Sequence, residues 1–205
     1  MKYILIAFTI IVILFSFPSK ESTISPLHST DTILAFGDSL TYGYNAKPSQ
    51  SYPSILSQLS HHKVINAGIP GETSADGLQR LPALLEDENI KLMLLCFGGN
   101  DIMQGVSMQS LKLNLKTMIH RAKEKQIQVV LIAVPNFTLF GLKALALYAE
   151  VADEENIALI DNMLADILAQ PSLKSDQIHP NALGYKIIGE QIYKRLKEEN
   201  LLSAR

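Results

Sequence analysis

Ser39 is the residue of this sequence at which we place the chemistry. It follows a short apolar segment, residues 32–36, which stops at Gly37. That segment is rich in β-branched and apolar residues and ends at a turn signal, a pattern typical of a buried strand. A serine just beyond a strand's carboxyl end lies where open α/β sheets bind ligands. Ser39 is therefore a candidate nucleophile. The alternative is that Asp38 and Ser39 only cap the following helix.

His179 is the candidate base for that serine. A serine hydroxyl attacks only when a base takes its proton, and the base works best when a third group fixes its tautomer. Asp176 precedes His179 by one turn and can accept a hydrogen bond from Nδ1, which leaves Nε2 free to face Ser39. Pro180 restricts His179 to extended backbone. The alternative is a loop histidine that caps the last helix.

Three donors could stabilise the oxyanion that forms when an acyl group is attacked. They are the backbone N–H of Ser39, the backbone N–H of Gly71 and the side-chain amide of Asn100. A neutral amide suits this role because it donates without competing for the proton that the base takes. For Asn100 the alternative is an ordinary polar turn after a strand.

Strands and helices alternate along the chain and are expected to position these residues. Such alternation at short spacing predicts βαβ units and a parallel sheet with helices on both faces. The carboxyl ends of the strands then bring the candidate residues to one rim, together with the loop after Pro135. Strands are expected at 32–36, 63–67, 90–97, 127–134 and 157–160. Helices are expected at 52–59, around 78–85 and 111–119, and at 139–155, 161–169 and 183–197. The helix at 161–169 would begin with an acidic cap at Asp161, and the helix around 78–85 with a capping box formed by Thr73 and Asp76.

Composition indicates one domain and excludes several classes of partner. The chain has 205 residues, of which 47% are hydrophobic, and no linker divides residues 32–205. Its net charge of −2 and the lack of a basic stripe argue against nucleic-acid binding. The single cysteine, Cys96, lies in an apolar run, so neither an intrachain disulfide nor a thiolate metal site is expected.

The amino-terminal residues resemble an export signal. Lys2 precedes an apolar run at residues 3–17, which is shorter than the roughly 20 residues that a membrane-spanning helix needs. We therefore expect residues 1–19 to be a signal peptide or signal anchor, residues 20–31 to be a linker, and the domain to be exported. No Ala-x-Ala-like cleavage site follows, so an uncleaved membrane tether stays open as an alternative.

Four motifs resemble those of the SGNH (GDSL-type) hydrolase family. They are Gly37-Asp-Ser-Leu40, the stretch Asn66–Ser74 that contains Gly71, Gly98-Gly-Asn-Asp101, and Asp176-Gln-Ile-His-Pro180. They occur in the family's order, and each stands at an expected strand end or in a late loop. The similarity is closest to the branch that holds the bacterial multifunctional thioesterase/lysophospholipase and arylesterases.

The resemblance implies a fold and a set of roles. The fold would be a flavodoxin-like three-layer α/β/α sandwich with a five-stranded parallel sheet. Ser39 would be the nucleophile, His179 the base and Asp176 the group that orients it, with Ser39, Gly71 and Asn100 as the oxyanion hole. No metal and no organic cofactor would be needed, and Asp38 and Asp101 would hold loops.

The expected activity is a serine ester hydrolase acting on a small-molecule ester or a lipid. Phe137, Leu139 and Phe140 follow the fourth strand and could line an acyl pocket, so lysophospholipids, acyl thioesters and aryl esters are the expected substrates. We expect a monomer. Two alternatives remain: a carbohydrate O-deacetylase of the cell envelope on the same scaffold, and a non-catalytic envelope-binding module.

Overall fold

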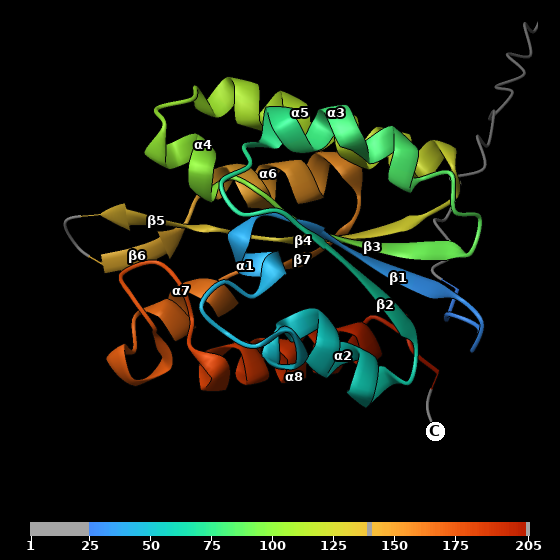
Figure 1. Ribbon diagram of the computed structural model, residues 1–205. Helices are drawn as coiled ribbons and strands as arrows, with labels where there is room; N and C mark the ends of the chain where they lie inside the picture. The colour runs from blue at the N-terminus through green and yellow to red at the C-terminus, as the bar shows by residue number, and fades with distance from the viewer. Residues whose placement is uncertain (1–24, 139–140, 204–205) are drawn as a thin grey trace, which may run out of the picture.

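A five-stranded parallel sheet forms the centre of the molecule. The computed structural model describes residues 25–138 and 141–203 (Figure 1). The strands lie in the order β2-β1-β3-β4-β7, and every neighbouring pair is parallel. Counted along the chain, this is the flavodoxin-like order 2-1-3-4-5, which confirms the predicted fold class. The bounds are β1 Thr32–Gly37, β2 Lys63–Gly68, β3 Ile90–Cys96, β4 Gln128–Ile132 and β7 Ala158–Ile160.

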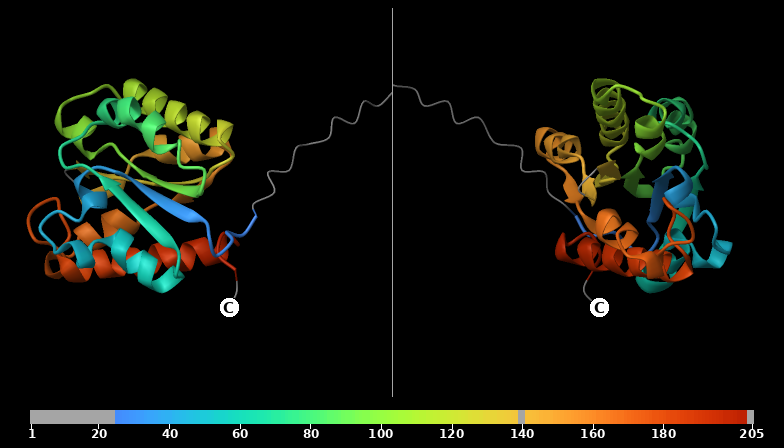
Figure 2. Two further views of the ribbon diagram at one scale, coloured as in Figure 1. Left: turned by 45° about the vertical axis from the view of Figure 1, so that its right-hand side comes forward. Right: turned by 90° about the vertical axis from the view of Figure 1, so that its left-hand side faces the viewer.

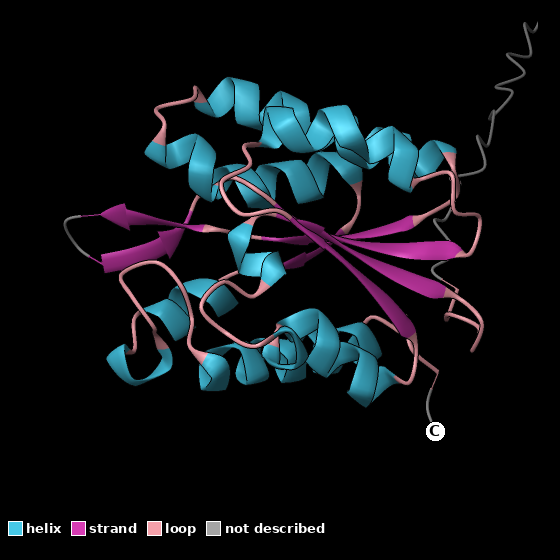
Figure 3. Cartoon of the chain, in the orientation of Figure 1, coloured by secondary structure: helices cyan, strands magenta, loops and turns pink. Residues whose placement is uncertain are grey.

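Helices cover both faces of this sheet, so the domain is a three-layer sandwich (Figures 2 and 3). One layer contains α3 (Ser74–Leu84), α5 (Met108–Glu124) and α6 (Ala146–Glu155), and α5 packs against both of the others. The opposite layer contains α2 (Tyr52–Ser60), α7 (Met163–Leu168) and α8 (Ala182–Glu198), with α8 against both α2 and α7.

Burial explains why the central strands are apolar throughout. Residues 92–96 of β3 are at most 1% exposed, because strands on both sides and helices on both faces surround them. Leu94 pairs with Ala35 of β1 and with Val130 of β4. The start of α3 is fixed as predicted by the capping box of Thr73 and Asp76, whose side chains each accept from the other's backbone N–H.

The segment after β4 differs from the prediction. Residues 139–155 were expected to form one helix, but α6 begins only at Ala146. Ahead of it lies an antiparallel pair of strands, β5 (Pro135–Thr138) and β6 (Gly141–Ala144). Bulky apolar residues suit strands as well as helices, and here β5 packs against α4 (Gly99–Met103) and β6 against α7. The expected cap at Asp161 is also wrong, since α7 starts at Met163 with Asn162 as N-cap and without a side-chain cap bond.

The two ends of the sheet have different roles. At the carboxyl ends of the strands lie the short helices, namely α1 (Ser39–Tyr42), η1 (Pro48–Gln50), α4 and η2 (Pro171–Leu173). At the opposite end, Leu27 is buried and forms a bridge with Leu202 just after α8. The predicted leader, residues 1–19, lies outside the described residues. In the described part of the chain, no helix has the length and apolar character to cross a membrane.

Candidate active site

The turn after β1 exposes Ser39 at the sheet's carboxyl edge. The side chain of Asp38 accepts a hydrogen bond from the N–H of Leu40 at 3.0 Å, which starts α1 and makes Ser39 its first residue. A Cβ atom at Gly37 would collide with the carbonyl of Cys96 and with the Thr41 hydroxyl. Only glycine therefore allows the sharp bend that brings Ser39 to the edge.

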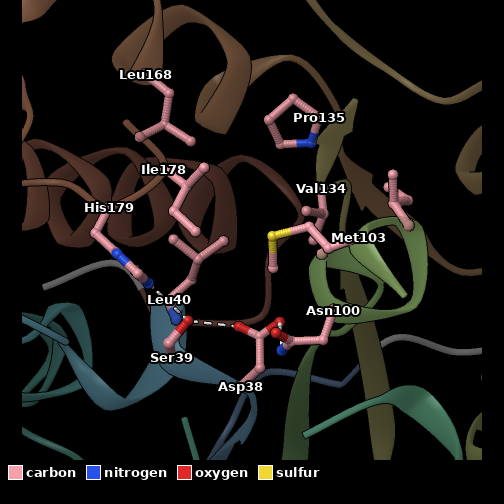
Figure 4. A pocket seen from close by; sticks show the side chains of 12 residues that line it. Asp38, Ser39, Leu40, Asn100, Met103, Val134, Pro135, Leu168, Ile178 and His179 are labelled. Atoms are coloured by element: carbon pink, nitrogen blue, oxygen red, sulfur yellow. Dashed lines mark hydrogen bonds between the residues drawn. The ribbon is translucent and has the colours of Figure 1, made fainter. Parts of the chain in front are cut away.

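Ser39, His179 and Asp176 form one continuous line of hydrogen bonds, of which Figure 4 shows the part between Ser39 and His179. His179 Nε2 lies 3.0 Å from Ser39 Oγ, although 140 positions separate the two residues in the chain. His179 Nδ1 lies 2.7 Å from Asp176 Oδ2. His179 itself is only 9% exposed. The structure thus brings the predicted nucleophile, base and orienting carboxylate into contact in the expected order.

The carboxylate of Asp176 is held by its own loop. Its Oδ1 accepts from the backbone N–H groups of Ile178 and His179 at 2.9 and 2.8 Å. Burial acts to raise the pKa of Asp176, but the hydrogen bonds from the His179 side chain and from these two amides outweigh it, so the pKa lies below its usual value. Asp176 is therefore ionised at neutral pH and fixes His179 with Nδ1 as the donor.

Asn100 lies on the other side of Ser39, in the first turn of α4, and is 8% exposed. Its Nδ2 donates to the carbonyl of Glu72 at 2.8 Å and approaches Asp38 Oδ2 at 3.4 Å. Gly71 precedes Glu72 in the same loop and has φ of +86°, a left-handed conformation that favours glycine. The loop that contains Gly71 is thus tied directly to the amide of Asn100.

Asp38 and Asp101 are both buried beneath these groups. Asp101 accepts from the backbone N–H of Ser74 at 2.8 Å and from its hydroxyl, which ties α4 to the start of α3. Burial raises the pKa of Asp38 to about 7, and the nearby carboxylate of Asp101 adds to that rise, while the hydrogen bond from Leu40 opposes it. Both side chains hold loops, and Asp38 also changes its charge near neutral pH.

A cavity opens to solvent beside Ser39 and His179. Leu139 and Phe140, which were expected to line an acyl pocket, lie outside the described residues, as does the side chain of Phe137, so their role stays a prediction. The polar floor of the cavity is formed by Asp38, Ser39, Gly99, Asn100 and His179, and its wall by Leu40, Ile102, Met103, Val134, Pro135, Leu168 and Ile178 (Figure 4).

The loop between α1 and η1 contributes two residues that were not predicted. The ring of Tyr44 lies against the imidazole of His179, with 4.7 Å between ring centroids. Asn45 Nδ2 donates to Asp176 Oδ2 at 2.9 Å, the oxygen that also accepts from His179. The sequence shows only a polar loop here. The one local signal is Asn45 itself, because asparagine tolerates the left-handed conformation that it adopts, with φ of +63°.

Comparison with known proteins agrees with this geometry. A sequence profile of the GDSL-like lipase/acylhydrolase family matches residues 35–187, which includes Ser39, Asn100, Asp176 and His179. The chain belongs to this family. Lipases and acylhydrolases split carboxylic esters, and membership identifies the chain as a carboxylic ester hydrolase. In the described residues, no group of three or more His, Cys, Asp or Glu side chains is arranged to hold a metal ion.

Curated relatives in the family have enzyme names. The chain is 30% identical over 176 residues to the thioesterase 1/protease 1/lysophospholipase L1 of Escherichia coli, a match that covers 82% of this chain and 85% of that protein. It is 31% identical to the esterase TesA of Pseudomonas aeruginosa, over 82% of this chain and 89% of the esterase. An arylesterase of Vibrio mimicus is 29% identical, over 82% and 89% of the two chains.

Solved structures extend the likeness to the fold. The crystal structure of TesA superposes with a TM-score of 0.74 at 29% identity and covers 82% of this chain and 99% of that one. The psychrotrophic esterase EstA from Pseudoalteromonas sp., inhibited by monoethylphosphonate, gives a TM-score of 0.73 at 26% identity, with 82% and 98% covered. The likeness in fold therefore extends over about four fifths of this chain.

Proposed function

We propose that this chain is a serine ester hydrolase that works through an acyl-enzyme. The observation that carries the proposal is the hydrogen-bonded line from Asp176 through His179 to Ser39, which ends at an apolar cavity beside the amide of Asn100. A non-catalytic binding module would not need a base poised at 3.0 Å from a serine oxygen.

The proposed reaction has two halves. Ser39 Oγ attacks the ester carbonyl as His179 Nε2 takes its proton, and the ionised Asp176 stabilises the imidazolium that results. The carbonyl oxygen becomes an oxyanion, which the N–H groups of Ser39 and Gly71 and the amide of Asn100 stabilise. As the tetrahedral intermediate collapses, His179 gives the proton to the leaving alcohol or thiol. Water then attacks the acyl-enzyme with the same base, and the free acid leaves.

The cavity favours an apolar acyl group. Seven of its lining residues are apolar side chains, which lower the free energy of a buried hydrocarbon chain but offer few partners to a sugar. We therefore expect lysophospholipids, acyl thioesters or aryl esters to react faster than acetylated carbohydrates. The names of the curated relatives in E. coli, P. aeruginosa and V. mimicus support the same substrate classes. Export through residues 1–19 is part of the proposal.

A fluorophosphonate probe and a panel of esters test the proposal together. The wild-type protein should be labelled at Ser39, and Ser39→Ala should not. In the ester panel, which varies acyl length and leaving group separately, Ser39→Ala and His179→Ala should each lower kcat by roughly 10⁴- to 10⁶-fold, and the double variant should be little worse. An unlabelled wild-type protein would favour the binding module, and faster turnover of acetylated sugars would favour the deacetylase.

A further inference from the structure

Arg80 in α3 connects three segments at the carboxyl edge of the sheet. Its Nε donates to both carboxylate oxygens of Glu72, at 2.9 and 2.8 Å, and its Nη2 lies 2.7 Å from Glu72 Oε2. The same Nη2 donates to the carbonyl of Ala67 at the end of β2, at 2.8 Å, and to that of Gly37 at the end of β1, at 3.3 Å. One guanidinium group therefore binds the ends of two strands and the loop that follows one of them.

Each of these segments leads to one of the proposed oxyanion donors. Gly37 stands two residues before Ser39, and Glu72 stands one residue after Gly71. The carbonyl of Glu72 accepts the hydrogen bond from Asn100 Nδ2 at 2.8 Å. An amide nitrogen has two hydrogens, and with one fixed on the Glu72 carbonyl the other is left to the long contact with Asp38 Oδ2 at 3.4 Å, which a substrate oxyanion can replace. Through Glu72, Arg80 thus bears on the direction of the Asn100 amide as well.

The guanidinium is held firmly enough to act as an anchor. It lies over the ring of Phe36, 4.6 Å from the ring centroid, and that ring packs edge-on against Phe97 in the core. The side chains of Arg80 and Glu72 are 22% and 15% exposed, so little water competes for their hydrogen bonds. Arginine's planar fork is suited to such bidentate binding, because less side-chain entropy is lost per bond than with lysine.

The loop from Ile69 to Thr73 needs an anchor of this kind. It has no regular secondary structure, and within it the N–H of Glu72 donates to the carbonyl of Ile69 at a long 3.4 Å. Oxyanion stabilisation depends on donors that are fixed before the reaction, since a displacement of about 1 Å can reduce the rate of an enzyme by roughly 100-fold.

We propose that Arg80 is a positioning residue of the oxyanion hole: it binds the Glu72 carboxylate, which fixes the position of the Glu72 backbone carbonyl and, through that carbonyl, the amide of Asn100. The inference rests on the proposed acyl-enzyme mechanism. Arg80 does not contact the substrate in this scheme. Its loss should therefore reduce stabilisation of the transition state and leave substrate binding nearly unchanged.

The test is Arg80→Met, compared with Arg121→Met as a matched control. Arg121 also ties a helix to a backbone carbonyl, donating from α5 to Leu78 of α3 at 3.0 Å, but it does not contact the Glu72 loop. Arg80→Met should lower kcat by about 10- to 100-fold with little change in KM, whereas Arg121→Met should retain the wild-type kcat. An equal kcat in the two variants, or a loss in Arg80→Met that appears only in KM, would overturn the inference.

A double-mutant cycle separates positioning from general destabilisation. If Arg80 acts through Asn100, Arg80→Met should lower kcat by a smaller factor in the Asn100→Ala background than in the wild type. The same factor in both backgrounds would refute that link. Arg80→Lys and Glu72→Gln, which remove less of the network, give the same comparison should Arg80→Met not fold. Ser39→Ala in the same assay keeps the two proposals apart, because a fully active Ser39→Ala protein refutes the mechanism and not only the role of Arg80.

Discussion

Replacing Asp38 by asparagine should raise the free energy of unfolding relative to the wild type progressively as the pH rises from 4 to 7. Asp38 is 1% exposed, and burial raises the pKa of its carboxyl from 3.8 to about 7. In the unfolded chain the carboxyl has its ordinary pKa of about 3.9. Between these two values the unfolded state has lost the proton and the folded state still holds it, so the free energy of unfolding falls as the pH rises. The asparagine amide does not ionise, so the variant does not undergo this loss.

The size of the effect follows from the pKa difference. Each pH unit between the two pKa values corresponds to about 1.36 kcal/mol, so the free energy of unfolding of Asp38→Asn relative to wild type should rise by about 4 kcal/mol between pH 4 and pH 8. The fit of the asparagine amide beside Leu40 and Asn100 also changes the free energy of unfolding, by an amount that does not depend on pH. Only the change with pH therefore measures the buried carboxyl.

Urea unfolding of both proteins at pH 4, 5.5, 7 and 8.5 gives this difference directly. It should increase up to about pH 7 and level off above it. Asp153→Asn makes the same chemical change at an exposed position of α6 and serves as the control. A difference between Asp38→Asn and wild type that stays constant over this pH range would refute the assignment of a raised pKa to Asp38.

Three further substitutions test other parts of the structure. Asn100→Ala should lower kcat by about 10²- to 10³-fold in ester hydrolysis, since it removes one oxyanion donor, and near-normal turnover would contradict that role. Asn45→Gly keeps the left-handed backbone but removes the donor to Asp176, so kcat should fall by about 2- to 10-fold; an unchanged kcat would mean that this hydrogen bond does not support the triad. Leu94→Ala in the fully buried β3 should lower the free energy of unfolding by about 2 to 5 kcal/mol in urea unfolding, and a loss below about 1 kcal/mol would indicate that the core collapses around the cavity.

The sequence predicted best those features that depend on strand ends. Apolar runs that stop at glycine located Ser39 and Asn100, and a parallel sheet necessarily brings the carboxyl ends of its strands to one edge. His179 and Asp176 were recognised because their spacing allows the short loop that joins them. Local patterns sufficed in these cases, because the geometry repeats in every sheet of this type.

Features that depend on packing between distant segments were not predicted. Residues 135–144 contain apolar residues that suit a helix as well as a strand, and contacts with α4 and α7 accompany the strand pair that forms. In the sequence Arg80 is only a basic residue in a helix and Asn45 only a residue of a polar loop. The structure shows that Arg80 binds Glu72 and that Asn45 binds Asp176. Long-range side-chain contacts of this kind leave no periodic pattern in the sequence.

The described chain enters the domain at the end of the sheet where the amino termini of the strands lie, which is the end opposite the pocket. Leu27 is seated there beside Leu202, whereas Ser39 lies at the far end of β1. A resin, a label or a fused protein joined ahead of residue 25 is therefore attached at the end of the domain that lies away from Ser39 and His179.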